Sequence, residues 1–251
     1  GLLDGSDLAR GRGYNAFWID PGTAYASVKG TWRTSWIVDP PNGQIPYSEN
    51  GRRLQREAGE LRRRGSGFDN PEERSLGERC IIQPTPGPPI GQYLYNNNVR
   101  INQAPDHIVI TTEMINDARI VRLTDEHRDP ELRPYMGDSI GWWEGDTLVV
   151  ETRDMNPMQR QTYGVYLTEN GKIIERFTRY NDSQILYEFE IHDPDVYSQV
   201  WKAEMALTDI GEDMYEYACH EGNDGLIGIL EGGRYANRQG REMVEEGERS
   251  E

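Results

Sequence analysis

Cysteine and histidine are scarce in this chain. Its 251 residues include two cysteines and four histidines. Cys80 and Cys219 lie far apart in the sequence, and neither belongs to a C-x-x-C pair, which argues against a zinc site or a thioredoxin-like motif. Two interpretations of the cysteines stay open: a disulfide formed in an oxidising compartment, or two buried thiols.

Several motifs of enzymes and cofactor-binding proteins are also missing. The sequence has no glycine-rich phosphate loop between a strand and a helix, no G-x-S-x-G and no H-E-x-x-H. The histidines are scattered, at His107, His127, His192 and His220. We therefore expect no nucleotide or other cofactor, no catalytic metal and no serine triad. The chemistry that remains is that of carboxylates on strands.

Long apolar runs and a basic surface are lacking as well. No run reaches the roughly eighteen apolar residues of a membrane helix, so no membrane insertion is predicted. The formal net charge of −16 repels nucleic acid, and the densest basic stretch, residues 52–64, is interrupted by Glu57 and Glu60 as in a solvated helix. No signal peptide is visible, and a chain that begins at glycine is compatible with earlier removal of a targeting segment.

Glycine and large aromatic residues, by contrast, are plentiful. The 27 glycines, 14 tyrosines and 6 tryptophans suit short strands, wide turns and aromatic packing. The clearest element is a β-hairpin over Gly137 to Asn156, in which Glu144-Gly145-Asp146 forms the turn. Alternation on its second arm places Leu148, Val150 and Thr152 on an apolar face and Glu151 on the other.

Short strands are predicted along most of the chain. Their connections are too short for helical crossovers, so we expect antiparallel neighbours in a meander, closed into a lipocalin-like β-barrel with no free edges. Besides the hairpin, the expected strands lie within Val28 to Asp39, Tyr93 to Gln103, His107 to Glu113, Ala118 to Leu123, Ile173 to Tyr180, Ile185 to His192, Gln199 to Leu207 and Met214 to Cys219.

A single domain, residues 1–251, is the expected organisation. Residues 1–27 are aromatic without a clear period and are predicted to form an N-terminal arm. Ser48 can cap a peripheral helix over 48–64, which has only a narrow apolar stripe. The charged residues of 232–251 are expected to form a disordered C-terminal tail.

Four residues are candidates for acid/base catalysis. Alternation places Glu188 on a strand face with Glu190 and His192, and Glu216 on one face with His220, while Glu151 follows from the hairpin. If these faces look into a barrel, aromatic neighbours would desolvate the carboxylates and make them usable general acids or bases. If the faces look outward, the same residues are ordinary solvated positions.

Other residues are candidates for binding the substrate. Asn97, within three consecutive asparagines, and Arg33 could orient a hydroxyl or carbonyl group, although an asparagine run is also typical of a turn. Aromatic side chains would supply the walls of the cavity; the candidates are Trp142, Tyr187 and Trp201.

Short motifs that cover most of the chain point to a family. They are Tyr14-Asn15 with Phe17-Trp18, RTSWIVDPPNGQIP (33–46), GERC (77–80), YNNN (95–98), DARIV (117–121), GDSIGWWEGDTLVVET (137–152), ERFTR (175–179), DPDVY (193–197) with Trp201, and YEYACHEGN (215–223). In these motifs the chain resembles a widespread group of secreted bacterial proteins of uncharacterised function. The resemblance implies export to the periplasm or cell exterior and a mostly β, lipocalin-like fold, and it implies no reaction. The chain departs from the group at Asn116 and Lys172, where such proteins often carry histidine.

Three hypotheses about function follow. The first is a cofactor-independent β-barrel enzyme of the lyase, hydratase, isomerase or cyclase type, acting on a small apolar or aromatic molecule. The second is a non-catalytic, lipocalin-like carrier in which the aromatic residues line a ligand cavity. The third is a structural periplasmic module whose interior is filled by side chains. The sequence leaves the oligomeric state open, a homodimer included.

Overall fold

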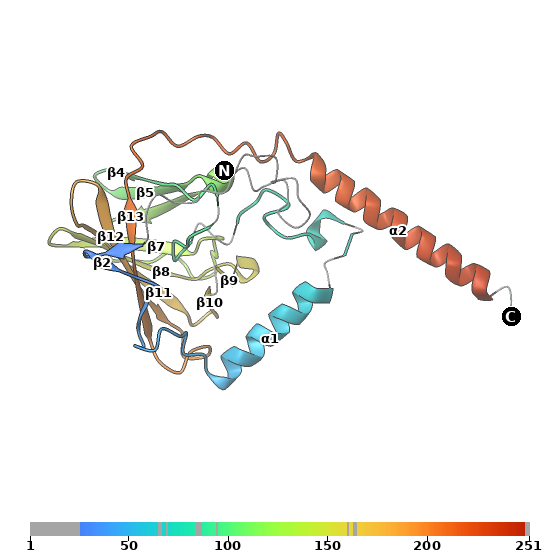
Figure 1. The fold of residues 1–251 in the computed structure, drawn as a ribbon, viewed down its shortest axis with the longest axis horizontal. Coiled ribbons are helices and arrows are strands. Elements are labelled where there is room, and N and C mark those ends of the chain that lie inside the picture. Colours follow the sequence, from blue (N-terminus) through green and yellow to red (C-terminus); the bar gives the residue numbers. More distant parts are fainter. Residues whose placement is uncertain are drawn as a thin grey trace.

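A nine-stranded sheet forms the body of the protein (Figure 1). The computed structural model describes residues 26–64, 67–68, 70–83, 87–93, 95–159, 161–162 and 165–248, so the expected N-terminal arm lies almost wholly outside the described residues. The order of the strands across the sheet is β3 (Ile37–Asp39), β13 (Trp201–Thr208), β12 (Gln184–His192), β11 (Lys172–Arg179), β8 (Thr147–Arg153), β7 (Asp138–Glu144), β6 (Ala118–Arg122), β5 (His107–Thr112) and β4 (Val99–Gln103).

Smaller elements surround the sheet. Two short hairpins pair β1 (Ser27–Val28) with β2 (Thr31–Trp32) and β9 (Gln161–Thr162) with β10 (Val165–Tyr166). Two α-helices, α1 (Glu49–Arg64) and α2 (Asp224–Glu248), lie outside the sheet. Three 3₁₀ turns, η3 (Pro71–Glu73), η4 (Met114–Asn116) and η5 (Pro157–Gln159), lie in the connections. None of the helices in the described part of the chain is long and apolar enough to cross a membrane.

The mainly β fold predicted from the sequence is confirmed, with one exception in the topology. All neighbouring strands of the sheet are antiparallel except β6 and β7, which run parallel because the segment 123–137 brings the chain back before β7 begins. Among the described strands, β3 pairs only with β13 and β4 only with β5, so no hydrogen-bonded seam joins the two edges.

The central hairpin forms as predicted. Trp142 pairs with Val149 and Glu144 with Thr147, and Gly145 takes the positive φ of +61° that the tight turn requires. Leu148, Val150 and Thr152 are buried on one face. Val149, on the other face, is also fully buried, so both sides of this hairpin are covered.

One hydrophobic core spans the sheet from edge to edge. It includes side chains from β12, β11 and β8, and partly buried residues of both edge strands, Ile37 on β3 and Ile101 on β4, pack against it. Both edge strands thus contribute to one contiguous core. We call the face of the sheet that carries Ile173 and Phe189 the core face.

Helix α1 begins where the sequence indicated. The Ser48 hydroxyl accepts a hydrogen bond from the Gly51 backbone N–H at 3.0 Å, which caps the first turn. Gly51 lies so close to the connection after β12 that an added Cβ would stand 2.1 Å from the Val196 carbonyl oxygen. The helix is therefore held against the sheet at its first turn.

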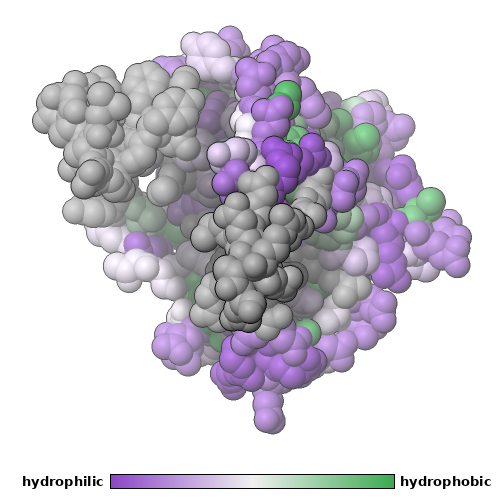
Figure 2. Space-filling model, turned by 90° about the vertical axis from the view of Figure 1, so that its right-hand side faces the viewer, coloured by the Kyte–Doolittle hydropathy of each residue, from purple (hydrophilic) through white to green (hydrophobic). Residues whose placement is uncertain are grey.

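The C-terminal region differs from the sequence prediction in two respects. The stretch Met214 to Cys219 was expected to be a strand, but the structure assigns it no strand. The predicted tail over 232–251 is wrong as well, since α2 continues to Glu248 and extends away from the sheet (Figure 1). Figure 2 shows the side of the molecule toward which α2 extends, and the described surface there is mostly hydrophilic, with small apolar spots. Cys80 and Cys219 form a disulfide, which decides between the two interpretations left open.

Candidate functional site

The candidate site lies on the sheet face opposite the core. Register places Ile140, Glu151 and Ile174 side by side on β7, β8 and β11, and places Asp138 in the next row along β7. Because side chains alternate along a strand, these residues point away from the core face that carries Val150. The segment between β6 and β7 returns across this region and brings His127 to the two carboxylates.

His127 contacts a carboxylate with each of its ring nitrogens. Its Nδ1 lies 2.8 Å from Asp138 Oδ2, and its Nε2 lies 3.2 Å from Glu151 Oε1. A neutral imidazole has only one N–H, and an ionised carboxylate can only accept, so both hydrogen bonds are formed when His127 carries both protons. Lys172 donates from the other side, with Nζ 2.9 Å from Glu151 Oε2. We call these four residues the acid–histidine cluster.

Asp138 is the more enclosed carboxylate of the cluster. It accepts hydrogen bonds from the Arg128 backbone N–H at 3.0 Å and from Arg122 Nη2 at 3.0 and 3.1 Å. Burial alone would raise the pKa of Asp138, but these donors and His127 outweigh burial and lower it. Asp138 is therefore an ionised anchor for the imidazole.

Glu151 carries the more exposed of the two carboxylates in the cluster. Its side chain is 19% exposed, against 5% for both His127 and Asp138. Burial again acts to raise the pKa of Glu151, but the hydrogen bonds and charges of Lys172 and His127 lower it overall. Glu151 thus remains a carboxylate at neutral pH, and its pKa moves in the direction opposite to the one that desolvation alone would give.

The other acid/base candidates do not join this cluster. Glu188 lies on the face opposite Tyr187 and is 3.4 Å from Lys29 Nζ, so of the two orientations that the sequence left open it takes the one away from the core. Glu216 and His220 are exposed and lie outside the strands, because the expected strand that would have aligned them is absent from this described stretch.

The predicted substrate-binding residues are dispersed. Arg33 forms an ion pair with Glu204. Tyr187 and Trp201 are fully buried in the core, where they pack against Phe189 at ring-centroid distances of 5.6 and 5.8 Å. Trp142 lies on the same face as Glu151, two residues beyond Ile140 on β7, and is 38% exposed. Only Trp142 is placed close enough to belong to the same site as Glu151.

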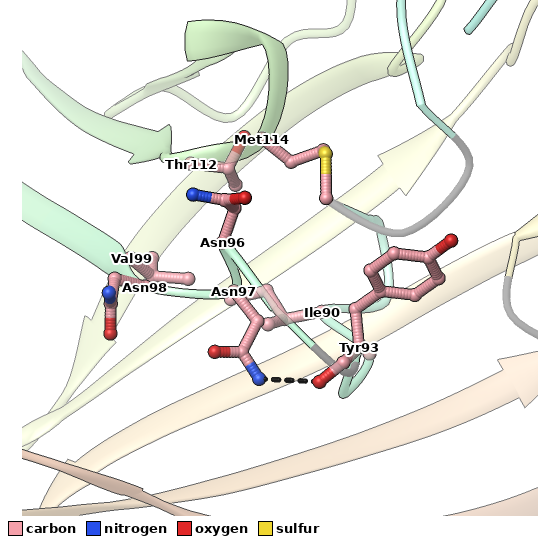
Figure 3. Close-up of a pocket in the computed structure, with 9 residues that line it drawn as sticks. Ile90, Tyr93, Asn96, Asn97, Asn98, Val99, Thr112 and Met114 are labelled. Carbon is pink, nitrogen blue, oxygen red and sulfur yellow. Dashed lines mark hydrogen bonds between the residues drawn. The ribbon is translucent and has the colours of Figure 1, made fainter. Parts of the chain in front are cut away.

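Asn97 lies in a separate, small hollow (Figure 3). The hollow measures about 240 Å³ including its open side, and it is lined by Ile90, Gly91, Tyr93, Asn96, Asn97, Asn98, Val99, Thr112 and Met114. The Asn97 amide donates to the Tyr93 carbonyl at 2.8 Å. The buried Glu113 carboxylate accepts from the amides of Asn96 and Asn98 at 3.0 and 2.7 Å, which fixes the direction of both.

The core face contains one buried ion pair. Arg119 of β6 binds the Glu175 carboxylate with both terminal nitrogens, and the second of these hydrogen bonds measures 2.9 Å. Tyr187 donates its hydroxyl to the same carboxylate at 2.7 Å and accepts from the Ile90 backbone N–H at 2.8 Å. Glu175 thus pairs with an arginine on a strand far away in the sequence.

Sequence reasoning identified Glu151 but missed its partners. His127 lies in an irregular segment with no periodicity, and Asp138 is the first residue of β7, so neither carried a signal beyond its residue type. Lys172 was noted only as a departure from the resembling group. In the described part of the chain, no three His, Cys, Asp or Glu side chains are grouped so that they could hold a metal ion.

The chain was compared with family models, with curated proteins and with solved structures, and none of them matches it. The fold and the site thus define a mainly β protein with a carboxylate–imidazole–carboxylate cluster on its sheet.

Proposed function

We propose that this protein is a cofactor-independent acid/base enzyme in which Glu151 exchanges protons with a small apolar or aromatic molecule. The observation that carries the proposal is the double engagement of His127, whose ring joins the accessible Glu151 to the enclosed Asp138. Such carboxylate–histidine arrangements suit proton transfer, because the imidazole can supply or accept a proton while the second carboxylate fixes its orientation.

The residues have different proposed roles, which follow from how exposed each side chain is. Glu151 takes a proton from a C–H or O–H group of the bound molecule. It returns the proton to another atom, as in an isomerisation, or gives it to a departing hydroxyl, which leaves as water, as in an elimination. His127 holds a proton at Nε2 beside Glu151, and Asp138 stabilises the imidazolium. Trp142 offers an exposed ring on the same face for an apolar or aromatic group.

Deuterium exchange tests this proposal without knowledge of the natural substrate. A panel of small aromatic and alicyclic ketones, hydroxy ketones and hydroxy acids is incubated with the protein in ²H₂O and analysed by mass spectrometry. Wild type is expected to incorporate deuterium into at least one compound, and Glu151→Gln and His127→Gln to lose at least about 100-fold of that rate. Glu188→Gln, on the same face but outside the cluster, is the matched control and keeps the rate.

Unchanged exchange in Glu151→Gln would contradict the proposal. The cluster would then serve only to hold the segment 124–128 against the sheet.

A non-catalytic carrier is the second candidate, in which Asn97, in the shallow hollow of Figure 3, would bind a hydroxyl or carbonyl group of the ligand. In this proposal the sheet curls into a lipocalin-like barrel, and the core shared by both edge strands supports that shape. Native mass spectrometry of the protein after incubation with bacterial extract tests it. A carrier retains a ligand of unchanged mass, and Asn97→Leu weakens the retention; an empty protein in every extract contradicts it.

We also propose that the protein works in the periplasm or outside the cell. The Cys80–Cys219 disulfide supports an oxidising compartment, because cytosolic thiols are usually kept reduced. The resemblance to secreted bacterial proteins implies the same location.

A further inference from the structure

A row of basic side chains crosses the sheet next to Glu151. Register pairs Arg153 of β8 with Lys172 of β11, and Lys172 with His192 of β12, so the three lie side by side on the face that carries Glu151. Their side chains are 44%, 43% and 31% exposed. We call these three residues the basic row.

The basic row contrasts with the charge of the whole molecule. Residues directly opposite one another on antiparallel strands have Cβ atoms about 5 Å apart, and like charges at that spacing destabilise a sheet. The chain as a whole carries a net charge of −16, so neighbouring basic residues stand out against its acidic composition. Each of the three also has an acidic neighbour: Asp154 beside Arg153, Glu151 beside Lys172 and Glu190 beside His192.

The hydrogen-bonding capacity of the row is only partly used. Arg153 Nε lies 3.1 Å from Asp154 Oδ2, but that oxygen makes no hydrogen bond, and the terminal nitrogens of Arg153 have no partner among the described residues. His192 Nε2 is buried 3.4 Å from Glu190 Oε2 and likewise makes no hydrogen bond. Lys172 uses one of its three N–H groups on Glu151.

We propose that the acid/base site takes small organic carboxylates, bound by Arg153 and Lys172. The planar guanidinium of Arg153 matches a carboxylate with two parallel N–H groups, and Lys172 adds a point charge. Because Lys172 also bonds Glu151, a carboxylate held there places its neighbouring carbon beside the catalytic base. The same cations would stabilise the negative charge that develops when a proton leaves that carbon.

This inference rests on the proposed function, since it names the substrate class of the same site, but binding can be measured without turnover. Benzoate and benzamide are suitable probes because they share size and ring and differ in charge. The protein has four histidines, so its histidine ¹H–¹³C NMR signals are few, and His→Asn variants at each position assign them. Benzoate is expected to shift the His127 and His192 signals saturably, and benzamide to leave them in place.

Charge-removing variants locate the binding residues. Arg153→Gln and Lys172→Gln are each expected to weaken benzoate binding about tenfold or more. Lys29→Gln is a matched control, because Lys29 is 45% exposed and lies 2.9 Å from Glu204, as Lys172 is 43% exposed and lies 2.9 Å from Glu151. Lys29→Gln should leave benzoate binding unchanged.

Two outcomes would overturn the inference: equal shifts with benzoate and benzamide, or equal weakening in Lys29→Gln and Lys172→Gln. Failure of the proposed function looks different, because deuterium exchange would then persist in Glu151→Gln whether or not benzoate binds at the basic row.

Discussion

At the scale of single residues, the charge of Glu151 depends on its two cationic neighbours. Lys172 and His127 together lower the pKa of Glu151 against the effect of burial. Lys172→Gln should therefore raise the pKa of Glu151, because the strongest opposing interaction is lost while burial remains. The pH titration of the Glu151 side-chain ¹³C signal measures this, and Lys29→Gln, which changes a distant lysine, should leave it unchanged.

The cluster also makes stability depend on pH in a defined direction. Asp138, Glu151 and Glu190 all have lowered pKa values in the folded protein. A carboxyl group whose pKa is lower when folded contributes stability at pH above its unfolded value of about 4, and loses it as pH falls through the folded value. We expect the unfolding free energy to decrease below about pH 4.5.

Asp138→Asn isolates one part of this dependence. Removing the charge leaves Arg122 and His127 without their ionised partner, so the variant should be less stable at pH 7 and should lose less stability on acidification than wild type. Urea unfolding at pH 7 and pH 4 measures both. An acid slope identical to that of wild type would show that Asp138 contributes nothing to it.

Removing one partner of the buried Arg119–Glu175 pair should lower the unfolding free energy strongly, whereas replacing both partners should lower it little. Arg119→Met leaves the fully buried Glu175 without its counter-charge, which typically costs about 3–5 kcal/mol of unfolding free energy. The double variant Arg119→Met with Glu175→Leu removes both charges and should cost much less. Urea unfolding compares the two, and a double variant as unstable as the single one would contradict this account.

At the scale of elements, local patterns predicted well wherever neighbouring residues decide the structure. The turn at Gly145 and the alternation of the β7–β8 hairpin could be predicted from the sequence, because positive φ and one buried face are properties of adjacent residues. Ser48 as the cap of α1 is local in the same way. The parallel pairing of β6 and β7 could not be predicted, because it depends on the path of the irregular segment 123–137 between the two strands.

Helix α1 offers a test of what holds it to the sheet. At Gly51 an added Cβ would meet the Val196 carbonyl at 2.1 Å, whereas at Gly59 it would meet nothing within 4 Å. Gly51→Ala should therefore destabilise the protein by about 1–3 kcal/mol through overpacking. Gly59→Ala, the matched control in the same helix, should stabilise it by about 0.5–1 kcal/mol, because glycine is a poor helix former. Thermal and urea unfolding distinguish the two signs.

At the scale of the whole molecule, the sidedness of the sheet decided which predicted residues could work together. Alternation correctly separated Glu188 from Tyr187, but it cannot tell which face of a strand meets the core until the partners of that strand are known. The charged face is the outer one, and it brings His127 from the segment before β7 to Asp138 and Glu151 on the two arms of the β7–β8 hairpin. A site assembled from an irregular segment and two strands has no signature in local sequence.

The disulfide joins the segment just before α2 to Cys80 in the body of the protein. The segment 209–223 before α2 contains no strand or helix, and its last residue, Asn223, donates to the Glu78 carbonyl at 2.9 Å. Within α2, Gly233 lies close to Phe68. Cys80 and Cys219 are 139 residues apart, and cross-links that close long loops remove much entropy from the unfolded chain. Replacing both by alanine should cost about 2–5 kcal/mol.

The loss should also be uneven across the molecule. Hydrogen exchange is expected to speed up in 211–240, which the disulfide joins to Cys80, and to stay slow in β11 and β12 under native conditions, because both are central strands whose backbone groups are paired on either side. Exchange followed by mass spectrometry resolves these segments. Equal acceleration in the sheet would mean that α2 and the sheet unfold as one unit, and that the cross-link stabilises the entire fold rather than the attachment of its last helix.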